Sequence, residues 1–349
     1  MEEKLLANEE AAHQKRLGQA KQRLEKDVRR EERISMLEMK LKNGNSFDVT
    51  DSDGDDNGND GCGLSPSEMA KLNGLLKVRD NFEEQYDPLS FTKEHVEFKA
   101  LHNDAFIALA RYCEQQRISC TQAKNGKGPN DTAEIEVEPM NVFFLDGSDA
   151  GTTSALINCG NFLPNQCFVA NCHKSTCEAL RISGGGKLPD KNVVHATASE
   201  ALSVNISTIN TNIDNKKSDA DIHNGVFVIQ EEGGLSEIDF GAYYFDGCGG
   251  FVPHVINMLS AALLNVDMNG SSNINTKPIA VGYSLLGSYK DVVEKELAVS
   301  RVLTVIAKRR RMRLTRVLDD PERFGVSPNI KKTDGSAGGG TFTTWLLID

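Results

Sequence analysis

Residues 142–156 read VFFLDGSDAGTTSAL, and this stretch decides the fold class. Val142–Leu145 is a short, continuous apolar run, which is typical of a strand buried on both faces. Asp146 and Gly147 end that run, and residues 152–159 then predict a helix. A buried strand that turns tightly into a helix is the repeating unit of α/β folds.

The same alternation of strands and helices continues to the end of the chain. We expect further strands at 166–170, 192–195, 226–230, 242–245, 278–284, 313–318 and 341–348. We expect helices at 174–181, from 199 onward, at 253–264 and at 290–311. Residues 139–349 therefore predict an α/β, Rossmann-like, mostly parallel sheet with helices on both faces.

Ligands of such sheets bind beyond the carboxyl ends of the strands, near the point where the strand order reverses. Five loops are expected along this rim: 146–153, 171–174, 196–200, 246–250 and 284–287. Candidate chemistry is expected in these loops.

Three segments precede the α/β domain. Residues 1–42 are rich in Glu, Lys, Arg, Leu and Ala and predict one charged helix, either a coiled coil or partner-docking helix or a solvated single helix. Residues 43–65 carry six Asp and many Gly and Asn, which predicts an acidic disordered linker. Residues 53–58 copy half of a calcium-binding EF-hand loop, but Leu64 stands where that loop needs Glu. Residues 66–138 predict a helical prelude that packs on the domain.

Composition narrows the classes of protein. The chain has 349 residues, 50 acidic and 39 basic, with a formal net charge of −11, which does not favour general nucleic-acid binding. No run approaches the 18–20 apolar residues that cross a bilayer, and the charged start lacks a secretory h-region. Eight cysteines without a C-x-x-C pair indicate reduced thiols, and hence an intracellular protein, cytoplasmic or nuclear.

One basic run departs from the acidic whole. Residues 308–313 read KRRRMR at the end of the long predicted helix. Cations suit a helix carboxyl terminus, and this is the simplest interpretation. A nuclear import signal or a local phosphate-binding patch are the alternatives.

The turn after the first strand is the first candidate site. Gly147 and Gly151 permit tight backbone geometry and close approach of a ligand. The backbone amides and the hydroxyls of Thr152 and Thr153 would face a ligand at a helix amino terminus. Asp146 and Asp149 repel pyrophosphate and suit a cationic amino group or a sulfonium. The alternative is an ordinary strand-to-helix turn with capping residues.

Residues 243–255, YYFDGCGGFVPHV, repeat this pattern. A buried strand ends at Asp246, glycines follow, and a helix opens near Pro253. The two Asp-Gly loops are expected to flank one crevice. Cys248 lacks an identifiable base and is interpreted as inert. His254 is interpreted as structural or as a proton acceptor at the rim.

A zinc site is one interpretation of Cys167, Cys172 and Cys177, with His173 beside them. These residues would lie in a buried strand, a loop and a helix, so that four ligands would not converge simply. We therefore expect incidental thiols and no metal.

The predicted order of elements resembles the class I S-adenosylmethionine-dependent methyltransferase superfamily. The resemblance covers residues 139–349 and is carried by a helix, a strand, a long loop and a final strand at the end of the chain. The ending RMRLTRVL…GGGTFTTWLLID resembles the C-terminal antiparallel hairpin of that family.

The resemblance implies S-adenosyl-L-methionine as cofactor. Asp146, Gly147, Gly151 and Thr152 occupy the place where the family holds the methionine portion of the cofactor. Asn171 ends the second strand, where the family grips the ribose hydroxyls. The implied adenine contacts are Thr197, Ser199 and Glu200. Asp246 occupies the place of substrate and catalytic contacts, where it would orient the methyl acceptor or take a proton from it.

Two other functions stay open. The chain could be a non-catalytic interaction protein that binds a partner through residues 1–42 and uses the Rossmann-like domain as a scaffold. It could instead be an NAD- or nucleotide-dependent enzyme, but no Gly-x-Gly-x-x-Gly follows the first strand.

Overall fold

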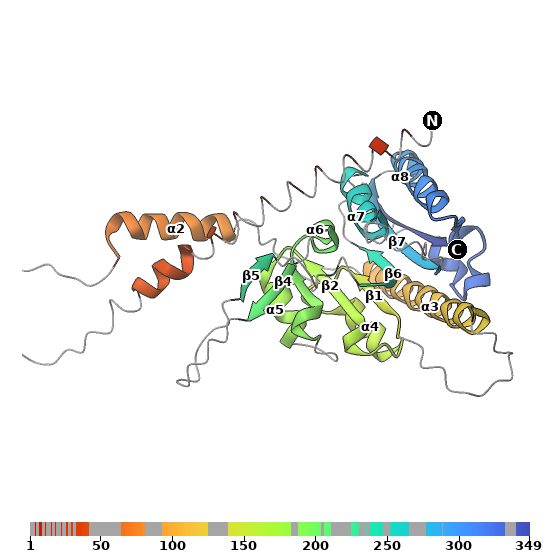
Figure 1. Ribbon diagram of the computed structural model, residues 1–349, viewed down its shortest axis with the longest axis horizontal. Helices are drawn as coiled ribbons and strands as arrows, with labels where there is room; N and C mark the ends of the chain where they lie inside the picture. The colour runs from red at the N-terminus through yellow and green to blue at the C-terminus, as the bar shows by residue number, and fades with distance from the viewer. Residues whose placement is uncertain are drawn as a thin grey trace, which may run out of the picture.

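The computed structural model describes most of the chain from residue 93 onward and two helical segments before it (Figure 1). The described ranges are 33–41, 64–80, 93–124, 139–182, 188–203, 206–210, 225–229, 235, 238–246, 252–264, 277–287, 289–331 and 340–349, with scattered helical positions before residue 31.

A seven-stranded sheet forms the centre of the α/β domain. Its spatial order is β3-β2-β1-β6-β7-β9-β8, and all pairs are parallel except those made by β9. The strands are β1 (Asn141–Phe144), β2 (Cys167–Asn171), β3 (Val193–His195), β6 (Phe240–Phe245), β7 (Ile279–Gly287), β8 (Leu314–Arg316) and β9 (Gly340–Ile348). The expected α/β fold with a mostly parallel sheet and antiparallel C-terminal strands is confirmed.

The strand order reverses between β1 and β6. From β1 the chain builds outward through β2 to β3, and then returns to place β6 on the other side of β1. Val142 pairs with Ala242 and Phe144 with Tyr244, so the two strands end at the same rim. This is the position at which open α/β sheets bind their ligands.

Helices cover both faces of the sheet (Figure 1). One face packs against α3 (Lys93–Lys124), α4 (Gly151–Asn158) and α5 (Lys174–Ile182). The other face packs against α6 (Ala198–Ser203), α7 (Val252–Leu264) and α8 (Tyr289–Arg309). The sheet is thus shielded from water on both sides, which explains why its strands read as continuous apolar runs.

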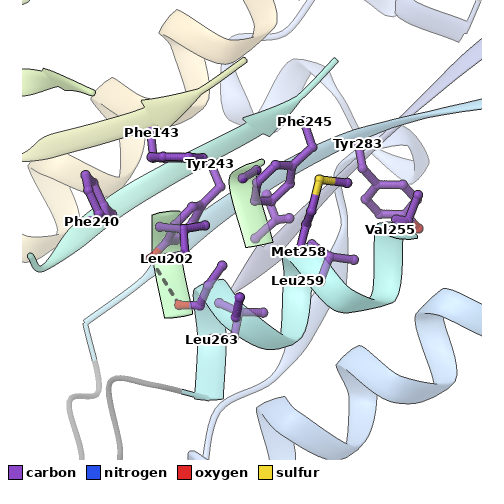
Figure 2. Packing of buried hydrophobic residues seen from close by; sticks show 14 of the residues in the cluster. Phe143, Leu202, Phe240, Tyr243, Phe245, Val255, Met258, Leu259, Leu263 and Tyr283 are labelled. Atoms are coloured by element: carbon purple, nitrogen blue, oxygen red, sulfur yellow. Dashed lines mark hydrogen bonds between the residues drawn. The ribbon is translucent and has the colours of Figure 1, made fainter. Parts of the chain in front are cut away.

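Strand β6 shows how successive residues serve the two faces. Tyr243 and Phe245 lie in the core that includes α7, while Tyr244 lies in the core that includes α3. Figure 2 shows Tyr243 and Phe245 packed beside Leu259 and neighbouring residues of α7. The Tyr243 hydroxyl donates to the Ala262 carbonyl at 3.1 Å, so its one polar atom is satisfied.

Several element boundaries differ from expectation. Residues 284–287 are no rim loop, because β7 continues to Gly287 and pairs there with Gly340 of β9. The strand expected at 313–318 covers only β8, and a 3-10 turn at Val317–Asp319 follows. A separate antiparallel hairpin of β4 (Ile206–Asn210) and β5 (Gly225–Ile229) was expected only at its second strand. Strand β4 was not predicted, because no local pattern in its sequence indicates a strand; it forms by pairing with β5.

Two helical segments near the N-terminus pack against each other. Ile34 and Leu37, from the helical residues 33–41, bury their side chains against Leu72 of α2 (Pro66–Asp80). Lys40 forms an ion pair with Glu68 at 3.0 Å. The described residues within 1–42 are helical, and the prediction of one continuous helix there stays a prediction.

The linker prediction at 43–65 is mostly outside the described residues, as are the half EF-hand motif at 53–58 and the end of the prelude at 125–138. Leu64 and Ser65 are described and belong to the N-terminal helical pair. Leu64 packs on its core, and the Ser65 hydroxyl accepts from the Glu68 amide at the start of α2.

Within the described part of the chain, no helix is both long enough and apolar enough to span a membrane.

Candidate functional site

The two aspartates singled out in the sequence follow neighbouring strands. The Leu145 amide donates to the Tyr244 carbonyl at 3.0 Å, which carries the β1–β6 ladder to the end of both strands. Asp146 and Asp246 come next on each strand and therefore lie at the same rim, beside the reversal point. The two Asp-Gly loops were expected to flank one crevice, and the pairing of β1 with β6 places the two aspartates at one rim although they are far apart in the sequence.

The Asp146 carboxylate is engaged by its own loop. Oδ1 accepts from the amides of Gly147 (3.0 Å) and Thr152 (3.2 Å). Oδ2 accepts from the amide and the hydroxyl of Thr153, both at 2.7 Å. Burial raises the pKa of Asp146 to about 6, against the bonds from Thr153 and Thr152, which favour the anion. Asp146 thus caps α4 and shapes the turn.

Gly151 and Thr152 begin α4 directly behind this turn. The chain enters the helix through Ala150 in a left-handed conformation (φ 52°). A Cβ built on Gly151 would lie 3.3 Å from the Asp149 carboxylate, which leaves little room for a side chain. The Thr152 hydroxyl donates to Asn103 Oδ1 on α3 at 3.1 Å, so it is held away from solvent.

Asn171 joins the ends of β1 and β2. Its Nδ2 donates to the Asp146 carbonyl at 2.9 Å, and its Oδ1 accepts from the His173 amide at 2.8 Å. The side chain predicted to hold a ribose therefore also fixes the relative position of two rim loops.

Thr197 and Glu200 form a capping box at the start of α6. The Thr197 amide and hydroxyl donate to Glu200 Oε2 at 3.0 and 2.6 Å, and the Glu200 amide donates to Thr197 Oγ1 at 3.4 Å. The adenine contacts that the resemblance implied for these two side chains compete with this local arrangement. Ser199 lies within it, with its hydroxyl 3.3 Å from that of Thr197.

Asp246 sits in a different environment. Its Oδ1 accepts from the Ser284 hydroxyl at 3.1 Å, and its Oδ2 lies 3.3 Å from Lys99 Nζ of α3. Its side chain is 14% exposed and that of Lys99 is 34% exposed, so this ion pair borders solvent. Asp246 is thus held by contacts with two elements that are distant in the sequence, α3 and β7.

The sequence reading missed the contribution of helix α3. His102 and Asn103 follow Lys99 by three and four residues, so both lie on the same side of the helix as Lys99. Lys99 meets Asp246, and Asn103 meets Thr152. The sequence does contain one signal for this site, namely three polar residues at helical spacing within an apolar stripe. The spacing alone does not identify the residues that these three side chains contact.

His102 is fully buried under this rim. Its Nδ1 accepts from the indole Nε1–H of Trp345 at 3.0 Å. Burial lowers the pKa of His102 to about 4, while the charge of Asp246 acts in the opposite direction. His102 is therefore a neutral imidazole at physiological pH.

The remaining candidates do not join this cluster. Cys167 and Cys177 are buried, Cys172 is exposed, and the Cys177 thiol lies 3.4 Å from the Asn171 carbonyl oxygen. Among the described residues, no group of three or more His, Cys, Asp or Glu could hold a metal ion. His254 is exposed on α7, and Cys248 lies outside the described residues.

The basic run at 308–313 is not a continuous surface patch. Arg310 is buried and donates to the Leu263 carbonyl at the end of α7 at 3.0 Å. Arg313 pairs with Asp349 at 3.2 Å. Arg310 and Arg313 thus fasten the end of α7 and the C-terminus. Lys308, Arg309, Arg311 and Arg313 are exposed, so the phosphate-patch and nuclear-import interpretations stay predictions.

The chain matches no family model, and comparisons with curated proteins and with solved structures find no similar protein. The functional argument therefore depends on the geometry of the rim.

Proposed function

We propose that the chain is a methyltransferase that uses S-adenosyl-L-methionine, with an acceptor that the sequence does not identify. One observation carries the proposal: Asp146 and Asp246 follow adjacent parallel strands at the reversal point of the sheet. The antiparallel β9 between β7 and β8 supports it, because it matches the hairpin on which the resemblance rests.

The proposed cofactor contacts come mainly from backbone. Four of the predicted side chains form hydrogen bonds within the chain and thereby fix the shape of the loops: Asp146, Asn171, Thr197 and Glu200. Gly147 and Gly151 would then let the cofactor approach the backbone closely, because neither carries a side chain. The amino group or the sulfonium of the methionine portion fits that environment, because the Asp146 carboxylate already accepts from the amides of Gly147, Thr152 and Thr153.

The chemistry asked of the protein is modest. Methyl transfer from a sulfonium to a nucleophile is an in-line displacement, and the enzyme accelerates it chiefly by orienting the two partners. Asp246 would orient the acceptor atom or take its proton. Its position beside Lys99 and Ser284 holds the carboxylate in one place.

A second function is favoured by the same hydrogen bonds. A rim whose predicted cofactor side chains are already engaged suits a scaffold domain that no longer binds a cofactor. In that case the N-terminal helical pair, residues 33–41 with α2, would supply the protein-binding part of the molecule.

An NAD-dependent enzyme is the least favoured of the three. The dinucleotide-binding sheet continues in parallel to its sixth strand. Here the neighbour of β7 on that side is the antiparallel β9.

Calorimetric titration of the whole chain with S-adenosyl-L-methionine tests the proposal. We expect saturable heat, and we expect NADH to give none. Gly151→Leu should abolish the heat by filling the approach to α4, whereas Gly74→Leu, at a helix position with no atom within 4 Å of the new Cβ, should leave it unchanged.

Absence of heat at millimolar S-adenosyl-L-methionine, with the folded state verified by the fluorescence of Trp345, would remove the methyltransferase proposal. The scaffold function would then remain. It predicts that removal of residues 1–65 abolishes assembly with a partner.

A further inference from the structure

Helix α3 ties both halves of the rim together. Lys99 reaches Asp246, beyond the end of β6, and Asn103 reaches Thr152, at the start of α4. His102 lies between these two side chains in the sequence of α3 and on the same side of the helix. The helix is therefore a wall of the candidate site and not only a prelude to the domain.

The tautomer of His102 is fixed by its neighbour. Trp345 Nε1–H can only donate, so His102 Nδ1 must be the acceptor and the proton of the neutral ring is on Nε2. Trp345 is itself held by Phe106 and Tyr244, with ring centroids 6.0 and 4.9 Å away. His102 therefore presents a fixed N–H donor.

That donor is not used within the described chain. His102 Nε2 is buried, and among the described residues no atom accepts a hydrogen bond from it. A buried donor without a partner destabilises the fold, because it has lost its hydrogen bond to water and gained none in return. Native structures rarely keep such a group unless a ligand or a water satisfies it.

The surroundings define the chemistry of the missing acceptor. Lys99 and Asp246 neutralise each other, and His102 and Asn103 are uncharged, so the cluster carries no net charge. A charged ligand group would enter a partly buried region without compensation, which is unfavourable. The ligand atom must accept a hydrogen bond from His102 Nε2–H and must carry no charge. An uncharged oxygen meets both conditions, and an adjacent N–H of the same ligand could donate to Asp246.

We propose that Lys99, His102 and Asp246 form the methyl-acceptor subsite and that it binds an uncharged carbonyl or carboxamide group. Its identification as an acceptor subsite rests on the proposed methyltransferase function, whereas its ligand class rests on His102 and the ion pair alone. The partly exposed Lys99–Asp246 pair marks the side from which a ligand enters.

Three probes of similar shape and different charge test the ligand class: benzamide, benzoate and benzylamine. The readout is the nitrogen NMR spectrum of the histidine-labelled full-length chain, together with the single indole N–H signal, since Trp345 is the one tryptophan. We expect the His102 proton on Nε2, and we expect benzamide to shift the His102 and Trp345 signals at least tenfold more than either charged probe at equal concentration.

His102→Gln and His102→Leu separate ligand binding from packing. Gln retains both an acceptor for Trp345 and a donor, so it should keep the benzamide affinity within about threefold, read from the indole signal. Leu should lose at least tenfold. Fluorescence of Trp345 shows whether each variant is folded, and the wild-type spectrum decides the question should the His102→Leu variant fail to fold.

Four results would each overturn the subsite. They are a His102 proton on Nδ1, equal shifts with all three probes, no shift with any probe, and a signal that reports only a bound water. The outcome is separate from that of the cofactor titration. Benzamide binding without heat from S-adenosyl-L-methionine would retain the subsite and reject the methyltransferase proposal. Heat from S-adenosyl-L-methionine without benzamide binding would retain the methyltransferase proposal and reject the subsite.

Discussion

At the scale of single residues, the rim divides into side chains that shape loops and side chains that face a possible ligand. Asp146 and Glu200 accept within their own loops, and Asn171 ties its loop to that of Asp146; each bond replaces one that water would otherwise make. His102 and Asp246 are placed by elements far away in the sequence. The second group carries the functional proposals for this reason.

His102 gives a prediction about pH. Its pKa is about 4 in the folded protein and 6.5 when unperturbed, so between these values the unfolded chain binds more protons. The stabilisation it provides is present above pH 6.5 and is lost as the pH falls toward 4. Relative to His102→Gln, the wild-type free energy of unfolding should fall by about 2 kcal/mol between pH 7 and pH 5.

Urea unfolding of both proteins at the two pH values, followed by Trp345 fluorescence, measures this difference. Asp146 and His195 also have shifted pKa values, but both proteins keep them and their effects cancel in the comparison. A pH-independent difference would mean that His102 titrates normally, and hence that it is not buried as described.

At the scale of elements, the packing of β9 on β7 is controlled by one glycine. Gly282 pairs with Trp345, and a Cβ built on it would lie 2.2 Å from an atom of the Trp345 ring. The ring has little room to move, because Phe106 and Tyr244 pack against it. The strand therefore needs a residue without a side chain at this position.

Gly282→Ala should destabilise the α/β domain by about 1–3 kcal/mol, as over-packing of a core does. Thermal unfolding followed by Trp345 fluorescence measures the loss. Gly74→Ala is the matched control, because nothing lies within 4 Å of its Cβ and Ala is the better helix former. Equal stability of Gly282→Ala and wild type would contradict the described packing.

At the scale of the whole molecule, three clusters of buried side chains are distinct. Two of them line the two faces of the seven-stranded sheet, and the third joins residues 33–41 to α2. The last has its own apolar contacts and its own ion pair between Lys40 and Glu68. The sheet and the helices α3 to α8 bury a core that does not include it.

Removal of residues 1–80 should therefore leave the unfolding temperature of the α/β domain within about 2 °C, since its two cores lose no described member. Calorimetry of the full and shortened chains makes the comparison, with Trp345 fluorescence as the second readout. A drop of about 10 °C would show that the N-terminal helices support the domain directly.

The local pattern of the sequence predicted most of the elements. Apolar runs such as 142–145 predicted the strands that are buried on both faces, and the positions of Gly and Pro predicted where most of these strands end. Strand β4 was not predicted, and β7 is longer than predicted. Pairing with β5 determines β4, and pairing with β9 determines the length of β7; in both cases the partner strand is remote in the sequence.

The sequence by itself determined the α/β class and the chain positions of Asp146 and Asp246, because strand and helix periodicity and turn residues act within a few residues. The two aspartate loops were expected from the sequence to flank one crevice, and the pairing of β1 with β6 places both at one rim. Only the tertiary structure decided that α3 brings Lys99 and His102 to Asp246 and that Asp146 serves its own turn. Hydrogen bonds and ion pairs between segments depend on where the chain is folded back, and no local pattern encodes that distance.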